Sequence, residues 1–194
     1  GTNYAHENGS NLYVTVNMMP HNEELHLLPD YLQQLDKIGV DSLIVSDPGV
    51  IQFIKNENID IPIHLSTQAN TVNWASANFW QKQGVERVIL ARELNREEIR
   101  EFAEKSDIER EIFIHGSMCI SYSGRCLLSN YMVGRDANRG ECAHSCRWKY
   151  HLMEEERPGE YYPVYEDKHG SYIMNSKDLC LIKYIPEIMD LNLS

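Results

Sequence analysis

The sequence predicts an α/β fold in which short, buried strands alternate with helices. Each apolar strand is followed by a polar tip, a helix and a glycine, and this unit recurs about every 23 to 25 residues. Strands this apolar need cover on both faces, which is typical of a parallel sheet. Because no Rossmann glycine fingerprint follows any strand, we expect a partial (β/α) TIM-like barrel, with an open doubly wound sheet as the alternative.

The individual elements follow from apolar periodicity and from helix-ending residues. Runs rich in β-branched residues predict strands at residues 12–16, 42–46, 61–65, 87–91 and 111–114. Helical spacing of leucines predicts a helix over residues 21–38 that Pro29 bends or breaks and Gly39 ends. Shorter helices are expected at residues 49–56 and 72–83, and Asn95 with Glu98 predicts a capped, charged helix.

Polar residues stand where the predicted strands end. In either candidate fold the site lies beyond the carboxyl ends of the strands, and this is where Asn17, Asp47, residues 64–68, residues 92–93 and residues 115–119 fall. His64, Gln68 and His115 are the candidate catalytic residues among them. The competing interpretation is that strand-to-helix loops are polar in any protein, and that His64 is structural.

The pattern changes after residue 147 and suggests a division of the chain into three parts. Residues 1–147 would form βα units that end in a cysteine-rich loop, residues 148–175 a small β excursion, and residues 176–194 a returning helix and the start of another element. Ser176 or Asp178 would cap that helix. Five or six βα units do not close a barrel of eight, so we expect a chain truncated at both ends. Exposed barrel edges in such a fragment would favour a homo-oligomer.

Composition and charge limit the possible partners. The formal net charge of −11 predicts a surface that repels phosphate, so nucleic-acid binding would need a local basic patch. Residues 125–149 provide one, because Arg and Lys outnumber Asp and Glu there. Without a signal peptide or a long apolar run, the sequence predicts a cytoplasmic protein that does not cross a membrane.

Four of the five cysteines lie in the segment 115–147, at Cys119, Cys126, Cys142 and Cys146, and the fifth is Cys180. A reducing compartment and an odd count argue against disulfides. The spacing leaves three possibilities open: an iron–sulfur site, a zinc site, or small buried side chains without metal. Only Cys142 and Cys146 have the spacing of a zinc-binding pair.

The same segment carries four arginines that could balance the charge of thiolates or hold phosphate, namely Arg125, Arg135, Arg139 and Arg147. The alternative is that they are solvated surface charges. A nucleophile at Ser117 or Cys119 with His115 as base is a further possibility, but no orienting acid is evident.

The segment EIFIHGSMCISYSGRCLLSNYMVGRDANRGECAHSCRWKY resembles the signature of the collagenase-like U32 peptidase family. NSKDLCLI is similar to a downstream cysteine motif of that family, and NLYVTVN, LIVSDPGV and IHLSTQAN are similar to its earlier strands. The resemblance covers nearly all of the chain. It is strongest to the branch whose members hydroxylate the wobble uridine of tRNA, and that branch resembles proteins that hold a 4Fe–4S cluster.

The resemblance implies a function and a set of ligands. Cys119, Cys126, Cys142 and Cys180 match the cluster ligands, with Cys146 as the alternative fourth; zinc or an empty site would be the alternative in a fragment. It also implies a (β/α) barrel with extra domains, tRNA as substrate and prephenate as a cosubstrate. A collagenase-like peptidase and a binding module with a structural zinc are the competing functions.

Overall fold

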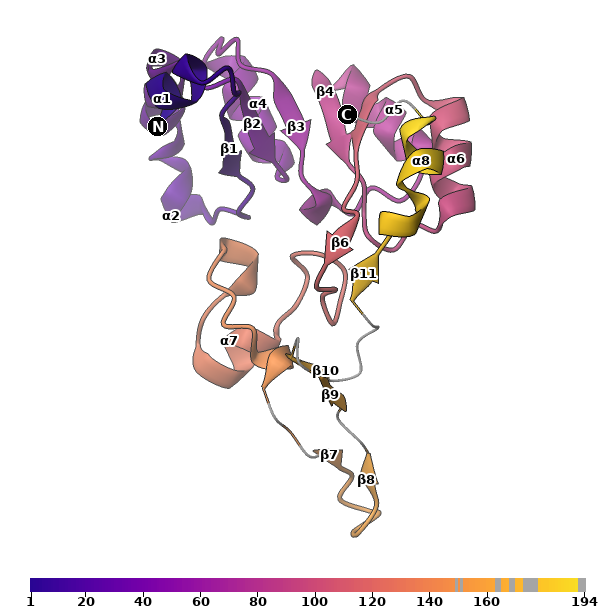
Figure 1. Ribbon diagram of the computed structural model, residues 1–194. Helices are drawn as coiled ribbons and strands as arrows, with labels where there is room; N and C mark the ends of the chain where they lie inside the picture. Colours follow the sequence, from indigo (N-terminus) through magenta and orange to yellow (C-terminus); the bar gives the residue numbers. More distant parts are fainter. Residues whose placement is uncertain (149, 151, 163–164, 168–169, 173–177, 192–194) are drawn as a thin grey trace. The chain divides into compact units, whose positions relative to one another are not determined.

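The computed structural model describes residues 1–148, 150, 152–162, 165–167, 170–172 and 178–191. Two compact units make up the chain (Figure 1). The first, called the sheet unit, comprises Gly1–Phe113 and Lys183–Ser194, and the second, called the cysteine unit, comprises Ile114–Ile182. The cysteine-rich segment 115–147 lies in the second of these units.

The sheet unit is built on one five-stranded parallel sheet. Its strands are β1 (Tyr13–Val16), β2 (Ser42–Val45), β3 (Ile63–Leu65), β4 (Val85–Ile89) and β5 (Glu109–Glu111), in the order β1-β2-β3-β4-β5. This confirms the α/β fold with parallel strands that neighbour one another in chain order. The order has no reversal, whereas a doubly wound sheet has one. Among the described residues β1 and β5 each have a single partner, so this sheet is not closed.

Helices follow the strands as the sequence predicts. They are α1 (Thr2–Glu7), α2 (Asn22–Leu25), α3 (Leu28–Ile38), α4 (Pro48–Asn56), α5 (Trp74–Lys82) and α6 (Arg96–Lys105), with a 3₁₀ turn η1 (Thr67–Ala69) after β3. The expected break near Pro29 is confirmed, since α2 ends at Leu25 and Pro29 lies in the first turn of α3. Gly39 ends α3 with a φ of 73°, and Asn95 and Glu98 form the predicted capping box.

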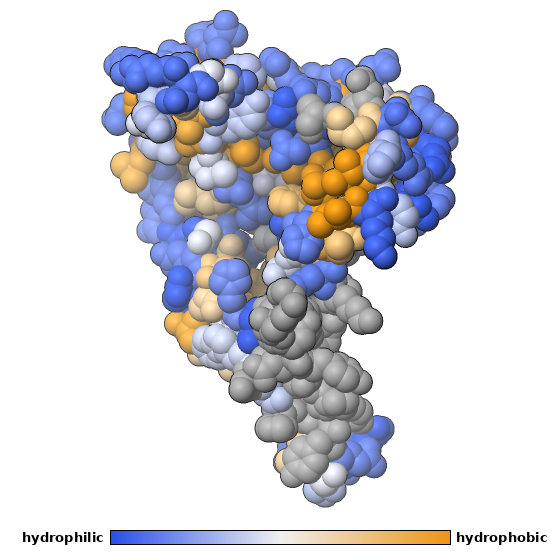
Figure 2. Space-filling model, in the orientation of Figure 1, coloured by the Kyte–Doolittle hydropathy of each residue, from blue (hydrophilic) through white to orange (hydrophobic). Residues whose placement is uncertain are grey.

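The core lies between the sheet and these helices. Leu43, Val45 and Leu65 of the strands are fully buried, and they pack in one cluster with Leu32 of α3 and Phe102 of α6. Each such side chain contributes about 1.5–3 kcal/mol through burial. Hydrophilic residues cover most of the visible surface, in keeping with the net charge of −11 (Figure 2).

Two strands begin earlier than the apolar runs suggested. β4 starts at Val85, and a bulge shifts its register so that Ile63 pairs with Val85 but His64 pairs with Arg87. The extra residue explains why the buried residues of β4 do not alternate strictly. β5 consists of Glu109, Arg110 and Glu111, and Arg87 of β4 forms ion pairs with both glutamates.

The helix that we expected to begin at Ser176 or Asp178 begins later in the structure. Leu179 and Cys180 form a strand, and the described helical residues begin with η4 (Ile182–Tyr184) and continue in α8 (Ile185–Met189). Pro186 suits the first turn of α8 because its missing N–H would have no helical partner there. Arg96 and Arg100 of α6 both pair with Glu187 and thereby fasten α8. Ser176 lies outside the described residues.

The cysteine unit consists of short elements joined by turns. Its helical segments are α7 (Leu128–Val133), η2 (Ala137–Arg139) and η3 (Ser145–Arg147). Three antiparallel pairs complete it: β6 (His115–Gly116) with β11 (Leu179–Cys180), β7 (Leu152–Met153) with β8 (Tyr161–Tyr162), and β9 (Tyr165–Asp167) with β10 (Gly170–Tyr172). The last two pairs confirm antiparallel β structure in the excursion, though parts of the expected strands fall outside the described residues. Across the whole described chain, no helix is both long and apolar enough to cross a membrane.

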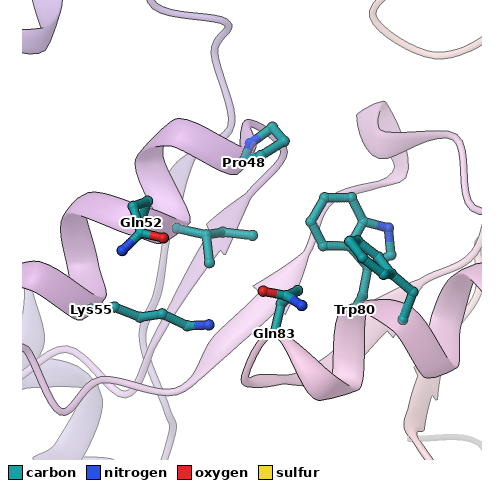
Figure 3. Close-up of a pocket in the computed structure, with 7 residues that line it drawn as sticks. Pro48, Gln52, Lys55, Trp80 and Gln83 are labelled. Atoms are coloured by element: carbon teal, nitrogen blue, oxygen red, sulfur yellow. The ribbon is translucent and has the colours of Figure 1, made fainter.

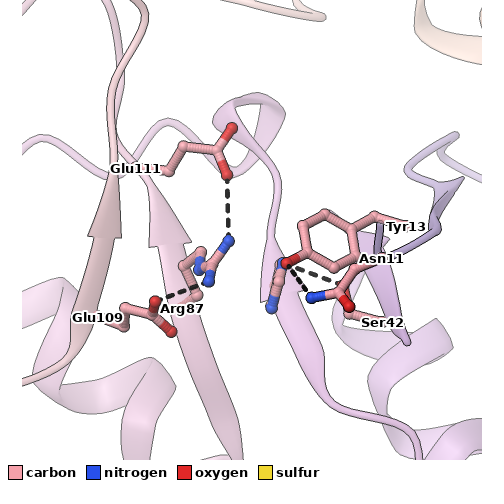
Figure 4. Close-up of polar contacts among 7 residues, drawn as sticks. Asn11, Tyr13, Ser42, Arg87, Glu109 and Glu111 are labelled. Carbon is pink, nitrogen blue, oxygen red and sulfur yellow. Dashed lines mark hydrogen bonds and ion pairs between the residues drawn. The ribbon is translucent and has the colours of Figure 1, made fainter. Parts of the chain in front are cut away.

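A row of polar side chains crosses the sheet, and His64 is part of it. Its Nδ1 lies 3.0 Å from Ser42 Oγ, and its ring makes an edge contact with Tyr13 at 4.8 Å between centroids. Arg87 lies over the Tyr13 ring and pairs with Glu109 at 2.6 Å (Figure 4). Burial, and then the charge of Arg87, lower the pKa of His64 from 6.5 to about 4. At neutral pH the imidazole is therefore uncharged.

We predict that His64 makes the sheet unit sensitive to mild acid. The unfolded chain takes up this proton near the ordinary pKa of 6.5 and the folded chain only near 4, so protonation favours unfolding. The stability that the uncharged His64 contributes to the fold is fully present above pH 6.5 and is lost as the pH falls towards 4. The midpoint temperature of thermal unfolding, measured between pH 6.5 and pH 4, should fall less steeply with decreasing pH for His64→Asn than for the wild type. Replacing the exposed His26 by Asn should leave the wild-type slope; equal slopes for all three proteins would contradict the prediction.

Candidate functional site

Polar side chains gather at the carboxyl edge of the sheet, as the sequence predicts. Ser46 Oγ donates to the carbonyl of Asn17 at 2.6 Å, and Asn17 Nδ2 donates to Ser66 Oγ at 3.5 Å. Thr67 Oγ1 donates to the carbonyl of Leu90 at 3.4 Å. These contacts tie together the loops after β1, β2, β3 and β4. Their first task is therefore to fix the loops in place.

The other predicted residues of this edge have distinct surroundings. Asp47 accepts from the backbone N–H groups of Gly49 and Val50 and so caps α4. Arg92 lies over the ring of Phe113 at 4.0 Å, which is cation–π distance, and Glu93 is exposed. Gln68 differs from them, because its Oε1 is buried and has no hydrogen-bond partner in the described part of the chain. A buried acceptor without a donor is costly, which makes Gln68 the residue of this edge best suited to receive a ligand donor.

A cavity of about 180 Å³ lies in the sheet unit between α4 and α5 (Figure 3). The lining residues come from these two helices and from the turn after α5, and they are Pro48, Ile51, Gln52, Lys55, Phe79, Trp80 and Gln83. None of the site residues predicted from the sequence lines this cavity, so it is separate from both candidate sites.

The cysteine-rich segment is the second candidate site. No disulfide joins the five cysteines, all of which lie in the described part of the chain. Gly134, with a φ of 68°, ends α7, and Gly140, with a φ of 84°, ends η2. These left-handed positions, which glycine adopts without strain, reverse the chain between Cys126 and Cys142. Ser129 Oγ of α7 then accepts a hydrogen bond from the N–H of Ala143 at 2.9 Å, which links the segment around Cys142 to α7.

Two sulfurs already accept backbone hydrogen bonds. The N–H of Leu128 donates to Cys126 Sγ, and the N–H of His144 donates to Cys142 Sγ, both at 3.4 Å. Burial raises the pKa of the Cys146 thiol, and the charges of Cys142, Cys126 and Cys119 raise it further, against the opposing effect of Arg147. Cys142, Cys126 and Cys119 are therefore near enough to act electrostatically on Cys146.

Cys180 is placed by a different element. It lies on β11, where it pairs with His115 of β6, and the N–H of Leu181 donates to the carbonyl of Ile114 at 2.7 Å. This pairing brings the segment that holds Cys180 beside the start of the cysteine-rich segment. Cys180 is exposed, so the alternative that it is a small buried side chain is wrong for this cysteine.

The chemistry around the thiols suits a group with several sulfur or other acceptor atoms. Ser121 Oγ, Ser145 Oγ and Tyr150 Oη are buried, and none has a hydrogen-bond partner among the described residues. Each can donate to a thiolate or sulfide. The predicted ligands are all sulfur, which suits iron–sulfur clusters and zinc. Within the described residues, however, no three His, Cys, Asp or Glu side chains stand together as a ready metal site. The donor types fit such a group, but a ready arrangement of ligands is not present.

The four predicted arginines differ in exposure. Arg125 and Arg135 are exposed, and Arg139 is half-buried in η2. Tyr131 of α7, between them in the sequence, is 85% exposed. Arg147 differs, because its side chain is only 13% exposed and contacts Asp178 and the carbonyl of Met118. Sequence reasoning did not find this pairing, because it considered Asp178 only as a possible helix cap.

His115 and Ser117 are both exposed in the cysteine unit. His115 belongs to β6, where its backbone pairs with Cys180. Among the contacts between described residues, none joins the imidazole of His115 to Ser117 or Cys119 as a nucleophile and base would require.

Comparisons with known proteins agree on a family. The model of peptidase family U32 matches residues 1–194. The chain is 42% identical to tRNA hydroxylation protein P of Escherichia coli strain K12, over 97% of the chain and 50% of that protein. It is 44% identical to tRNA hydroxylation protein P1 of Bacillus subtilis strain 168, over 100% of the chain and 46% of that protein. The chain thus spans about half the length of these relatives.

The fold has a counterpart among solved structures. The structure of the U32 peptidase Mk0906 resembles the chain with a TM-score of 0.51 at 19% identity, over 59% of the chain and 50% of that structure. At this identity the likeness concerns the fold alone. Since the family model matches every residue, this chain belongs to peptidase family U32.

Proposed function

We propose that this chain is part of an RNA-modifying enzyme that hydroxylates the wobble uridine of tRNA. The observation that carries the proposal is its identity of 42% and 44%, over nearly the whole chain, to two proteins named for tRNA hydroxylation. The chain spans about half the length of each of these two relatives. We therefore propose the activity for the corresponding whole protein.

The proposed cofactor is a 4Fe–4S cluster held by Cys119, Cys126, Cys142 and Cys180, with Cys146 as the alternative fourth ligand. The all-sulfur set of predicted ligands and the backbone N–H groups that donate to Cys126 and Cys142 support it. So do the unpartnered hydroxyls of Ser121 and Ser145, which stand close to Cys119 and Cys146 in the sequence. Such a group supplies electron transfer when bound. In the isolated chain purified in air, zinc or an empty site is the expected alternative, because thiolates bind zinc tightly.

The proposed contact surface for tRNA is the basic part of the cysteine unit. Arg125 and Arg135 are exposed in a chain whose net charge is otherwise strongly negative, so they are the groups placed to attract phosphate. Exposed Tyr131 lies between them in the sequence and offers a ring on which an unpaired base can stack. Local positive charge and base stacking would thus bind the substrate, although the net negative charge of the chain repels phosphate.

Hydroxylation replaces a C–H bond of the base by C–OH, which is a two-electron oxidation, so an oxygen donor must be reduced. Prephenate is the donor that the family resemblance implies, and we include it in the proposal. Gln68, with its unsatisfied buried oxygen at the carboxyl edge of the sheet, is the proposed contact for a ligand in the sheet unit. The unreversed order of β1 to β5 is that of a (β/α) barrel, and we propose that the sheet forms part of one.

The proposal predicts a specific loss from tRNA. Deleting the gene in its own host should remove 5-hydroxyuridine, and a copy carrying Cys119→Ala should fail to restore it, because the cluster would lose a ligand. Mass spectrometry of the tRNA nucleosides measures this directly. Unchanged wobble uridine hydroxylation after deletion would refute the proposed function. Cleavage of gelatin by purified protein that survives Cys119→Ala would favour a peptidase instead.

The ligand assignment predicts how much iron each cysteine variant retains. After anaerobic reconstitution of the chain, Cys119→Ala, Cys126→Ala and Cys142→Ala should each lose most of the bound iron and sulfide. Cys180→Ala should lose it as well, whereas Cys146→Ala should keep it. The opposite result for the last two variants would assign Cys146 as the fourth ligand. Zinc bound by the wild type in place of iron would contradict the cluster.

The basic surface predicts a salt-dependent loss of RNA binding. Arg135→Glu should weaken tRNA binding and reduce the slope of log affinity against log salt by about 0.7 to 0.9 if it removes one phosphate contact. Arg157 is exposed in the same unit, in the turn between β7 and β8, and provides the matched control. Arg157→Glu makes the same change of charge, so an equal loss in both variants would indicate only a general charge effect.

A further inference from the structure

Arg147 connects three segments of the cysteine unit that lie far apart in the sequence. It extends from η3, and its Nη2 donates to the carbonyl of Met118 and to Asp178 Oδ1, both at 3.0 Å. The side chains of Arg147 and Asp178 are 13% and 23% exposed. This pair is thus shielded from water far more than an ordinary surface ion pair.

The two partners of Arg147 stand next to predicted ligands. Met118 directly precedes Cys119, and Asp178 stands two residues before Cys180. The β6–β11 pairing between these segments is short, with Gly116 opposite Leu179 and His115 opposite Cys180. A ladder of two residue pairs is a weak constraint on its own. Arg147 adds a second link at the end of the ladder that leads towards Cys119.

The chemistry of this link suits arginine. Its guanidinium is always charged and planar, so one nitrogen can direct its two N–H groups at two acceptors held at fixed angles. The interaction with the Asp178 carboxylate is charge-assisted and partly buried. Removing the guanidinium would leave the carboxylate of Asp178 shielded from water without this partner, which is unfavourable.

We propose that Arg147 is a positioning residue that joins the Cys119 and Cys180 segments, so that their thiols can bind a common metal cluster. The inference rests on the proposed function, because that function supplies the cluster. It separates Arg147 from the exposed arginines, with which the sequence had grouped it as a contact for RNA. The side chain acts through the two segments that it joins.

The test compares variants of the full 194-residue chain after anaerobic reconstitution. Arg147→Met should lose iron to a chelator about tenfold faster than the wild type, as expected for outer-shell partners of a metal site. Asp178→Asn should also speed the loss of iron. Arg147→Lys, which keeps the charge, should lose iron at a rate between those of Arg147→Met and the wild type. The double variant Arg147→Met/Asp178→Asn should be no worse than Arg147→Met, because both changes break one interaction. Arg157→Met is the control and should keep the wild-type rate.

A second measurement, hydrogen exchange on the metal-free chain, needs no cluster. In Arg147→Met the amides of residues 118–120 and 179–181 should exchange faster, while those of α7 should be unchanged. Faster exchange throughout residues 114–182 would overturn the local role, and so would a wild-type rate of iron loss in Arg147→Met. A wild-type chain that takes up no iron would instead contradict the proposed cofactor. The two failures are therefore distinguishable.

Discussion

Parallel pairing of β1 to β5 determines where the polar loops of the sheet unit lie, because all carboxyl ends of a parallel sheet meet at one edge. Each strand must return through a helix, and the helices bury Leu43, Val45 and Leu65 on one face. The hydrogen bonds of Asn17, Ser46 and Ser66 then follow from that shared edge. Side chains that alternate to the other face form the polar row of Tyr13, His64 and Arg87. A one-residue slip in register would exchange the two faces, and this makes the register of the buried face strongly specified.

The cysteine unit depends on a different constraint, since its described strands are two or three residues long and form no larger sheet. Regular hydrogen bonding therefore contributes little to its order, and turns, caps and side-chain contacts replace it. Gly134 and Gly140 supply left-handed turns, and Ser129 fastens the chain that returns from them. Arg147 closes a much longer loop, because its partners Met118 and Asp178 are 29 and 31 residues away. Contacts of that separation must offset the entropy of loop closure, which favours a charged, shielded pair over a single neutral hydrogen bond.

Local patterns predicted the sheet unit well because its elements are decided by neighbouring residues. The break before α3, the capping box of α6 and the order of five parallel strands could all be predicted from the sequence. The errors occurred where pairing between strands decides the outcome. The bulge in β4 arises in its pairing with β3, and the charged strand β5 pairs with β4, so neither can be predicted from one local window of sequence. The expected helix near Asp178 failed for the same reason, since β11 exists only because β6 pairs with it.

The candidate site shows the same division between composition and contact. Cysteine spacing and the family resemblance made the thiols candidates, and charge counting made the arginines candidates, but neither could assign different tasks to residues of one type. The structure separates Arg147, which is shielded and pairs with Asp178, from Arg125 and Arg135, which are exposed. Burial raises the pKa of the Cys146 thiol, and the charges of neighbouring cysteines raise it further, so its surroundings oppose the thiolate. The adjacent guanidinium of Arg147 acts in the opposite direction. The proposed metal cluster would add positive charge beside the same thiol.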